Sequence, residues 1–296
     1  MSRDIRNPGR PRTLLRHLAV STAVLFATIV VTMSIFERSL IFFPTRFPDG
    51  EWDAQVVSRG SGCTIEDCFF SAADEVRLHG WLCRREEISE GIGTGATVLW
   101  FHGNAGNLSD RADLLLQLAT RLPAEVMIID YRGYGRCGGR PSEAGLYRDA
   151  RAAWRYLVEE RGVAPGAIVI FGKSLGGAVA VDLATEVDAA GLIVESSFTS
   201  VPAMATHHYP FVPPFLVRTR MDSLSKISSI HCPKLFVHSR ADEVVPFTLG
   251  CELYEAAPEP KTFFEIEGAA HNETAVVGGT AYFEALSKFI TTCTHQ

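Results

Sequence analysis

The sequence lacks the basic surface that binding to nucleic acid requires. Its 28 Lys and Arg residues are outnumbered by 34 Asp and Glu residues, which gives a formal net charge of −6 at pH 7. Neutralising several phosphates needs clustered positive charge. Since no nucleic-acid-binding motif occurs along the chain either, nucleic acid is not an expected partner.

Metal-binding patterns are missing as well. The seven cysteines are too dispersed for a zinc site, and the adjacent His207 and His208 have no cysteine or carboxylate pattern beside them. We therefore expect neither a metal nor another cofactor. Cys63 and Cys68 flank a short stretch and could form a disulfide in an oxidising compartment, but buried free thiols are equally typical. The sequence leaves both possibilities open.

Neither an internal repeat nor a low-complexity tract interrupts the chain. At 296 residues, of which 47% are hydrophobic, it is long enough for one large core, since α/β domains of about 200–250 residues are common as single units. We expect one main domain over residues 37–296.

Charge is absent from one long segment, residues 18–36, which follows a basic tail at residues 1–17 with five arginines and one acid. About 20 apolar residues in a helix span the hydrocarbon core of a bilayer. A cleavable signal peptide has a shorter apolar region of roughly 7–15 residues that leads to small residues, whereas this run leads into the bulky sequence IFER (35–38). We predict an uncleaved, single-pass transmembrane anchor.

The arginines also predict the orientation of this anchor. Positively charged flanks stay on the cytoplasmic side, so the main domain should lie on the periplasmic, lumenal or extracellular side of the membrane. The next stretch, residues 37–48, contains aromatic residues and two prolines. It is expected to be extended at the membrane surface.

Beyond residue 60, strand and helix patterns alternate. The segment 65–84 alternates in the manner of antiparallel strands at a sheet edge. Apolar runs typical of strands buried on both faces occupy 97–101, 126–130, 167–171, 191–195, 234–238 and 262–266. Amphipathic stretches of helical length occupy 108–122, 142–161, 175–187 and 280–290. This order is typical of an α/β fold, with a mostly parallel sheet covered by helices and ligands at the carboxyl ends of the strands.

The alternation breaks at about residues 200–230. This segment is too rich in proline to form one helix. Long irregular segments inside a compact domain are often lids over a functional site. We expect a lid insertion here, with simple surface packing as the alternative.

A serine stands in the pattern G-x-S-x-G, formed by Gly172, Ser174 and Gly176, between the apolar run 167–171 and the helical stretch 175–187. A weakly nucleophilic serine hydroxyl is best presented on a sharp turn between a strand and a helix, where small flanking residues permit close packing. We therefore predict Ser174 as a nucleophile.

Two backbone positions suit an oxyanion hole. The sequence HGN after the run 97–101 places Asn104 where hydrolases supply one N–H group, and Leu175 would supply the other. Such donors stabilise a tetrahedral intermediate. A phosphate-binding loop is the alternative, but GNAGN (103–107) has neither G-x-G-x-x-G nor a P-loop lysine.

An acid and a base complete the pattern. His271 lies in a loop of small residues between the last strand and the last helix, and Asp242 follows the run 234–238. Glu243 and Glu195 are alternative acids. We prefer Asp242 because it lies in a loop after a strand and keeps the order Ser, Asp, His.

Several segments together resemble one known family. LIFFP, WFHGNAGN, DYRGYG, FGKSLGG, ESSFTS, DEVVPF and the GAAHN loop are similar to the Bem46-type and ABHD13-like branch of the α/β-hydrolases, from Leu40 onward. The resemblance implies the α/β-hydrolase fold with a mostly parallel eight-stranded sheet and a single N-terminal anchor. It also implies Ser174, Asp242 and His271 as catalytic residues and Asn104 and Leu175 as oxyanion donors.

We accordingly expect a serine hydrolase that cleaves a carboxylic ester or related acyl bond through an acyl-enzyme intermediate. Its substrate would be a small molecule or a lipid. A peptidase or an acyltransferase would use the same residues. From a different class, a catalytically idle, membrane-anchored scaffold is the alternative.

Overall fold

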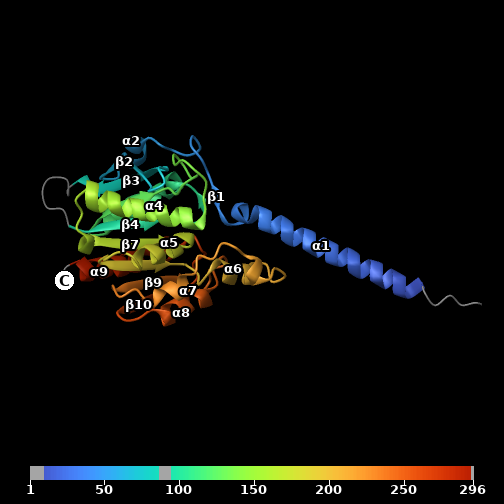
Figure 1. Ribbon diagram of the computed structural model, residues 1–296. Helices are drawn as coiled ribbons and strands as arrows, with labels where there is room; N and C mark the ends of the chain where they lie inside the picture. The colour runs from blue at the N-terminus through green and yellow to red at the C-terminus, as the bar shows by residue number, and fades with distance from the viewer. Residues whose placement is uncertain (1–9, 87–94, 295–296) are drawn as a thin grey trace, which may run out of the picture.

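A long helix stands out from a compact α/β domain, on the side that carries β1 and α6 (Figure 1). The computed structural model describes residues 10–86 and 95–294. The first nine residues of the predicted basic tail lie outside the described residues. Helix α1 (Arg10–Ile41) is longer at both ends than the predicted span 18–36.

Eight strands form the central sheet, in the order β10-β9-β8-β7-β4-β6-β3-β2. In this order, the six neighbouring strands from β10 across β4 to β6 pair in parallel. Strand β3 is antiparallel to both of its neighbours, β6 and β2. Their bounds are Cys63–Ser71 (β2), Arg77–Arg85 (β3), Thr97–Phe101 (β4), Glu125–Ile129 (β6), Ile168–Lys173 (β7), Gly191–Glu195 (β8), Lys234–Ser239 (β9) and Lys261–Ile266 (β10). This confirms the predicted fold, because every predicted strand is present.

Helices cover both faces of the sheet, so β4, β7, β8 and β9 are buried along their whole length. One face packs against α4 (Glu143–Arg155), α5 (Leu175–Ala184) and α8 (Phe247–Ala256). The other face packs against α3 (Ala112–Arg121) and α9 (Thr274–Thr294).

Two predicted burial patterns are wrong. Strand β10 is the edge strand, and only Ile266 among its residues is buried. Helix α5, predicted to be amphipathic, has all ten residues buried. The pattern of an isolated segment does not show that a short helix will pack between the sheet and other helices.

The end of α1 joins the domain through a second, small sheet. Strand β1 (Phe43–Pro44) pairs in parallel with β5 (Ala105–Gly106), just after the loop that contains Asn104. A short helix, α2 (Ala54–Ser58), follows along the chain. The prediction of an extended stretch at 37–48 is wrong for 37–41, because α1 continues to Ile41 and ends shortly before Pro44, which disfavours helix at the preceding residue.

The segment 200–230 is a broken insertion, as its prolines predict. It contains α6 (Val201–His208), a 3₁₀ turn (Pro214–Leu216) and α7 (Ser223–Ile227). The amides of Arg218 and Thr219 in this lid segment donate to Glu37 Oε1 of α1, over 3.0 and 2.6 Å. This segment, called the lid below after its predicted role, is therefore attached to the long helix.

Cys63 and Cys68 are both free. They lie five positions apart on β2 and belong to the cores on opposite faces of the sheet. At about 3.3 Å per residue their Cα atoms are roughly 16 Å apart, far beyond the 7 Å limit of a disulfide. The fold excludes this bridge.

A buried ionic network links β7, β8 and α9. Lys173 Nζ lies 2.8 Å from Glu195 Oε1 and donates to Thr274 Oγ1 over 2.9 Å. Thr274 and Tyr282 donate their hydroxyls to Glu195, over 2.6 and 2.7 Å. Burial by itself would raise the pKa of Glu195, but the charge of Lys173 and these hydrogen bonds outweigh burial and lower that pKa.

Gly176 allows α5 to lie directly against β4. A Cβ atom at this position would lie 2.0 Å from the Phe101 carbonyl oxygen, whereas one at Gly166 would meet nothing within 4 Å. We predict that Gly176→Ala lowers the free energy of unfolding by at least about 2 kcal/mol, since a backbone clash in a packed core cannot relax cheaply. Thermal unfolding would show it, with Gly166→Ala as the matched control; equal stability of the two variants would contradict this account.

Glu195→Gln should destabilise the fold by about 3 kcal/mol at neutral pH, because it leaves the Lys173 charge buried without a counter-charge. The exposed ion pair of Glu186 with Arg151 provides the control, since Glu186→Gln should cost less than about 1 kcal/mol.

The destabilisation by Glu195→Gln should also depend on pH. A carboxylate with a lowered folded-state pKa stabilises the fold above its unfolded pKa of about 4.3 and loses this contribution as pH falls through the folded value. Urea unfolding at several pH values should therefore show the wild type and Glu195→Gln converging on acidification. A gap that widens at low pH would contradict the ion pair.

Candidate functional site

Ser174 occupies the sharp turn between β7 and α5. Its backbone has φ 55° and ψ −119°, a conformation that costs a residue with a side chain about 1–3 kcal/mol. The surrounding structure holds it there. The Ser174 amide donates to the Glu195 carbonyl over 2.8 Å, and its own carbonyl accepts from Ser197 Oγ over 2.8 Å.

Glycines make this turn possible. A Cβ atom at Gly172 would lie 2.2 Å from the Gly176 carbonyl oxygen, so strand and helix approach as closely as the pattern G-x-S-x-G predicts. A Cβ atom at Gly103 would lie only 3.6 Å from Ser174 Cβ. The HGN loop therefore passes directly beside the serine.

Asp242 and His271 form a buried pair. His271 Nδ1 lies 2.8 Å from Asp242 Oδ2 and 3.0 Å from Oδ1. The amides of Val244 and Val245 donate to Asp242 Oδ1, over 3.0 and 2.7 Å, and His238 Nε2 lies 3.3 Å from Oδ2. These contacts fix the carboxylate toward the imidazole.

The electrostatics of this pair favour a carboxylate ion. Burial by itself would raise the pKa of Asp242, but hydrogen bonds from His238, His271 and the Val245 amide outweigh burial and hold the pKa far below its ordinary value. An ionised Asp242 accepts a hydrogen bond from His271 Nδ1–H, which orients the imidazole ring.

The alternative acids are engaged elsewhere. Glu243 Oε2 accepts the backbone N–H of His271 over 3.0 Å, so it contacts the histidine loop but not the ring. Glu195 is committed to Lys173, Thr274 and Tyr282. Of the three carboxylates that the sequence offered, Asp242 is the one that bonds to the imidazole of His271.

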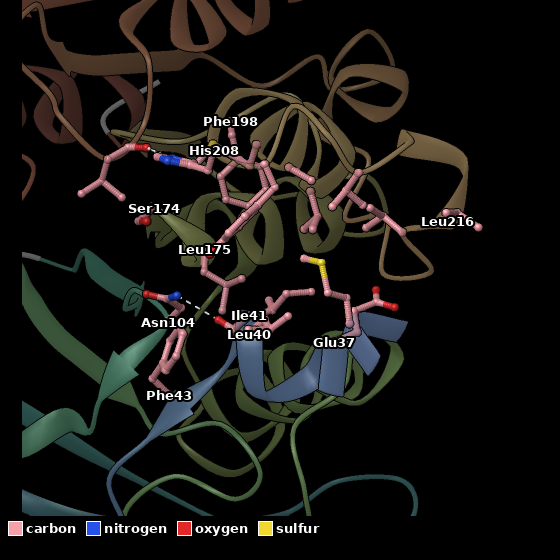
Figure 2. Close-up of a pocket in the computed structure, with 18 of the residues that line it drawn as sticks. Glu37, Leu40, Ile41, Phe43, Asn104, Ser174, Leu175, Phe198, His208 and Leu216 are labelled. Carbon is pink, nitrogen blue, oxygen red and sulfur yellow. Dashed lines mark hydrogen bonds between the residues drawn. The ribbon is translucent and has the colours of Figure 1, made fainter. Parts of the chain in front are cut away.

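Ser174, Asn104 and Leu175 line one cavity of about 330 Å³, within the size range of small-molecule sites. Its walls come from the end of α1 on one side and the lid on the other, with Ser174 and Leu175 at the turn between them (Figure 2). Val244, two residues after Asp242, lines the same cavity. Leu175 is the first residue of α5, so its amide belongs to the unsatisfied donors of a helix N-terminus.

Ser174 and His271 are linked through the buried network. Lys173, which precedes the serine, bonds to Thr274, three residues beyond the histidine. The strand end and the histidine loop are thus held together. Among residues 10–86 and 95–294, no three His, Cys, Asp or Glu side chains gather as metal ligands would.

Other histidines have structural contacts. His102 is fully buried, and its Nδ1 lies 2.7 Å from the Gly103 carbonyl oxygen, which agrees with a structural role for this ring. His208 Nε2 donates to the Val244 carbonyl over 2.8 Å and so joins the lid to the loop of Asp242. His207 lies beside it, exposed on α6.

Sequence reasoning missed the contribution of α1 to the site. Five residues of this helix line the cavity, namely Val30, Met33, Glu37, Leu40 and Ile41. Asn104 Nδ2 also donates to the Ile41 carbonyl over 2.8 Å. The one available signal was Glu37, an acid placed directly after the apolar run.

Comparisons with known proteins agree with this architecture. A family model described as serine aminopeptidase, S33, matches residues 94–223. An uncharacterized protein of Mycobacterium tuberculosis is 38% identical over 281 residues, which cover 93% of this chain and 95% of that protein. Alpha/beta hydrolase domain-containing protein 17B of Xenopus tropicalis is 35% identical over 195 residues, or 66% of each chain.

Solved structures show the same fold. An esterase of Pyrococcus furiosus superposes with a TM-score of 0.65 at 19% identity, covering 85% of this chain and 98% of that one. An alpha-beta hydrolase of Vibrio vulnificus gives a TM-score of 0.64 at 22% identity, covering 79% and 82%. With the sheet order, the strained serine turn and these relatives, the chain belongs to the α/β-hydrolase superfamily and is a hydrolase.

Proposed function

We propose that the protein is a serine hydrolase that cleaves a carboxylic ester or a related acyl bond. The observations that carry the proposal are Ser174, held in a strained turn at a cavity, and the bonded Asp242–His271 pair, whose loop is tied to the strand before Ser174 through Thr274 and Lys173. Serine is a poor nucleophile at neutral pH unless a base takes its proton. The histidine and the ionised aspartate supply that base.

In the proposed mechanism, Ser174 Oγ attacks the carbonyl carbon while His271 takes the hydroxyl proton. The amides of Asn104 and Leu175 donate to the oxyanion, and each such donor is worth on the order of 3 kcal/mol. His271 then protonates the leaving alcohol, which departs and leaves an acyl-enzyme. A water molecule, deprotonated by His271, releases the acid and restores the serine.

The apolar lining of the cavity favours an acyl substrate over a peptide. Most side chains that line the cavity are apolar. Among the described residues that line the cavity, Glu37 is the one carboxylate, and its Oε1 already accepts two backbone amides of the lid. The esterases among the structural neighbours agree with this preference. The serine-aminopeptidase family model keeps a peptidase, like an acyltransferase, as the alternative.

We also infer that α1 anchors the enzyme in a membrane. Leu14–Met33 is apolar and unburied, and its 20 residues measure about 30 Å, the thickness of a hydrocarbon core. Thr22 and Thr28 donate their hydroxyls to carbonyls one turn earlier, as lipid requires. Cleaving α1 as a signal peptide would remove part of the cavity wall. The arginine-rich tail supports a cytoplasmic N-terminus and a catalytic domain on the opposite side.

A fluorophosphonate probe tests the nucleophile. The detergent-solubilised full chain should be labelled at one serine, and Ser174→Ala should abolish labelling because no other activated serine is expected. Labelling of Ser174→Ala at the wild-type rate would refute the assignment and favour the non-catalytic scaffold.

Asp242→Asn should lower kcat on a short acyl ester by on the order of 10⁴-fold, because the amide no longer fixes the imidazole in the productive tautomer. Glu243→Gln keeps an oxygen acceptor for the His271 amide and should retain most of the activity. If Glu243→Gln loses more than Asp242→Asn, the acid is misassigned.

Membrane orientation has its own test. In a bacterial host, an alkaline phosphatase fused after residue 296 should be active, and a green fluorescent protein fused there should stay dark, because the C-terminus is expected outside the cytoplasm. The full chain should resist extraction from membranes by alkaline carbonate. A fluorescent fusion would place the domain in the cytoplasm and overturn the orientation.

A further inference from the structure

The end of α1 is a built part of the site. Phe42 is buried, and the Phe43 amide donates to the Asn104 carbonyl over 2.9 Å. Asn104 in turn donates from its side chain to Ile41, and Glu37 binds the lid. These contacts fix the helix against both the oxyanion loop and the lid.

The cavity also reaches the part of α1 that is expected to lie in the membrane. Val30 and Met33 line the cavity and belong to the span Leu14–Met33. Ile41 lies at the other end, near Asn104 (Figure 2). At 1.5 Å per residue, the helix between Val30 and Ile41 is about 16 Å long. A surface that is apolar apart from Glu37 thus runs from the expected level of the bilayer to Ser174.

The charge of the cavity restricts what enters it. Among the described residues that line it, none is Lys or Arg. Glu37 bonds to two lid amides through Oε1, and the ring of His208 bonds to Val244. A phosphate headgroup would therefore find no cationic partner here and would meet a carboxylate, which disfavours an anionic ligand.

We propose that the last turns of α1 form an acyl-chain subsite, and that the substrate is a neutral lipid ester whose fatty acyl chain passes from the bilayer along Val30 and Met33 to Ser174. The proposal rests on the serine hydrolase activity proposed above. One ester and one water give one fatty acid and one alcohol, and the acyl group is held on Ser174 Oγ between the two steps.

A chain-length experiment on the full-length protein in phosphatidylcholine vesicles tests this subsite. Monoacylglycerols of graded chain length serve as substrates, and fluorophosphonate labelling of each variant reports an intact nucleophile. Met33→Trp should lower the ratio of long-chain to short-chain kcat/KM by about tenfold or more, because the added ring fills the path of the chain.

The two subsite positions predict an order. Val30 lies farther along α1 from Ser174, so Val30→Trp should cut off activity at a longer chain than Met33→Trp does. Val31→Trp is the matched control, because Val31 is exposed and lies off the cavity. It should leave the chain-length profile at its wild-type shape.

The possible outcomes separate the subsite from the activity. An unchanged profile in a labelled, active Met33→Trp protein would refute the subsite and leave the hydrolase intact. Wild-type protein that neither labels nor hydrolyses any ester would refute both. Faster hydrolysis of a lysophosphatidic acid, or of an S-acylated peptide of matched chain length, than of the monoacylglycerol would refute the neutral lipid as substrate.

Discussion

The ion pair between Lys173 and Glu195 holds the candidate site together. Lys173 is the last residue of β7, and Glu195 is the last residue of β8. The residues that follow them, Ser174 and Ser196, begin the loops at the candidate site. Through Thr274 and Tyr282 the pair also fixes the start and the middle of α9. A buried pair of this kind is strongly destabilising when one partner is removed, so the three elements depend on both charges.

This arrangement explains how a strained serine is tolerated. The turn at Ser174 costs about 1–3 kcal/mol, and the cost is offset by hydrogen bonds from both of its backbone polar groups and by a fully buried helix behind it. The Asp242–His271 pair is held by a separate set of contacts, the amides of Val244 and Val245 and the ring of His238. The proposed nucleophile and base are thus held by different local contacts, and Lys173 and Thr274 tie their two loops together.

Much of this could be predicted from the sequence, because the signals are local. Apolar runs give the strands, and G-x-S-x-G between a strand and a helix predicts the turn at Ser174. The sequence favours Asp242 over Glu195 by position alone, since only the fold shows that Glu195 faces Lys173. Burial of α5, exposure of β10 and the separation of Cys63 from Cys68 depend on packing between distant segments. The role of α1 in the cavity was hidden for the same reason, since a hydropathy pattern identifies a span but not what lies against it.

The contacts at the end of α1 bear on how this protein should be handled. Cutting the chain ahead of the domain would leave the amides of Arg218 and Thr219 and the side chain of Asn104 without their partners, and it would open one wall of the cavity to water. A fragment made in this way would keep Ser174, the proposed nucleophile, but lose the surface that we propose selects among acyl chains. Its substrate preferences would then describe the fragment rather than the full chain.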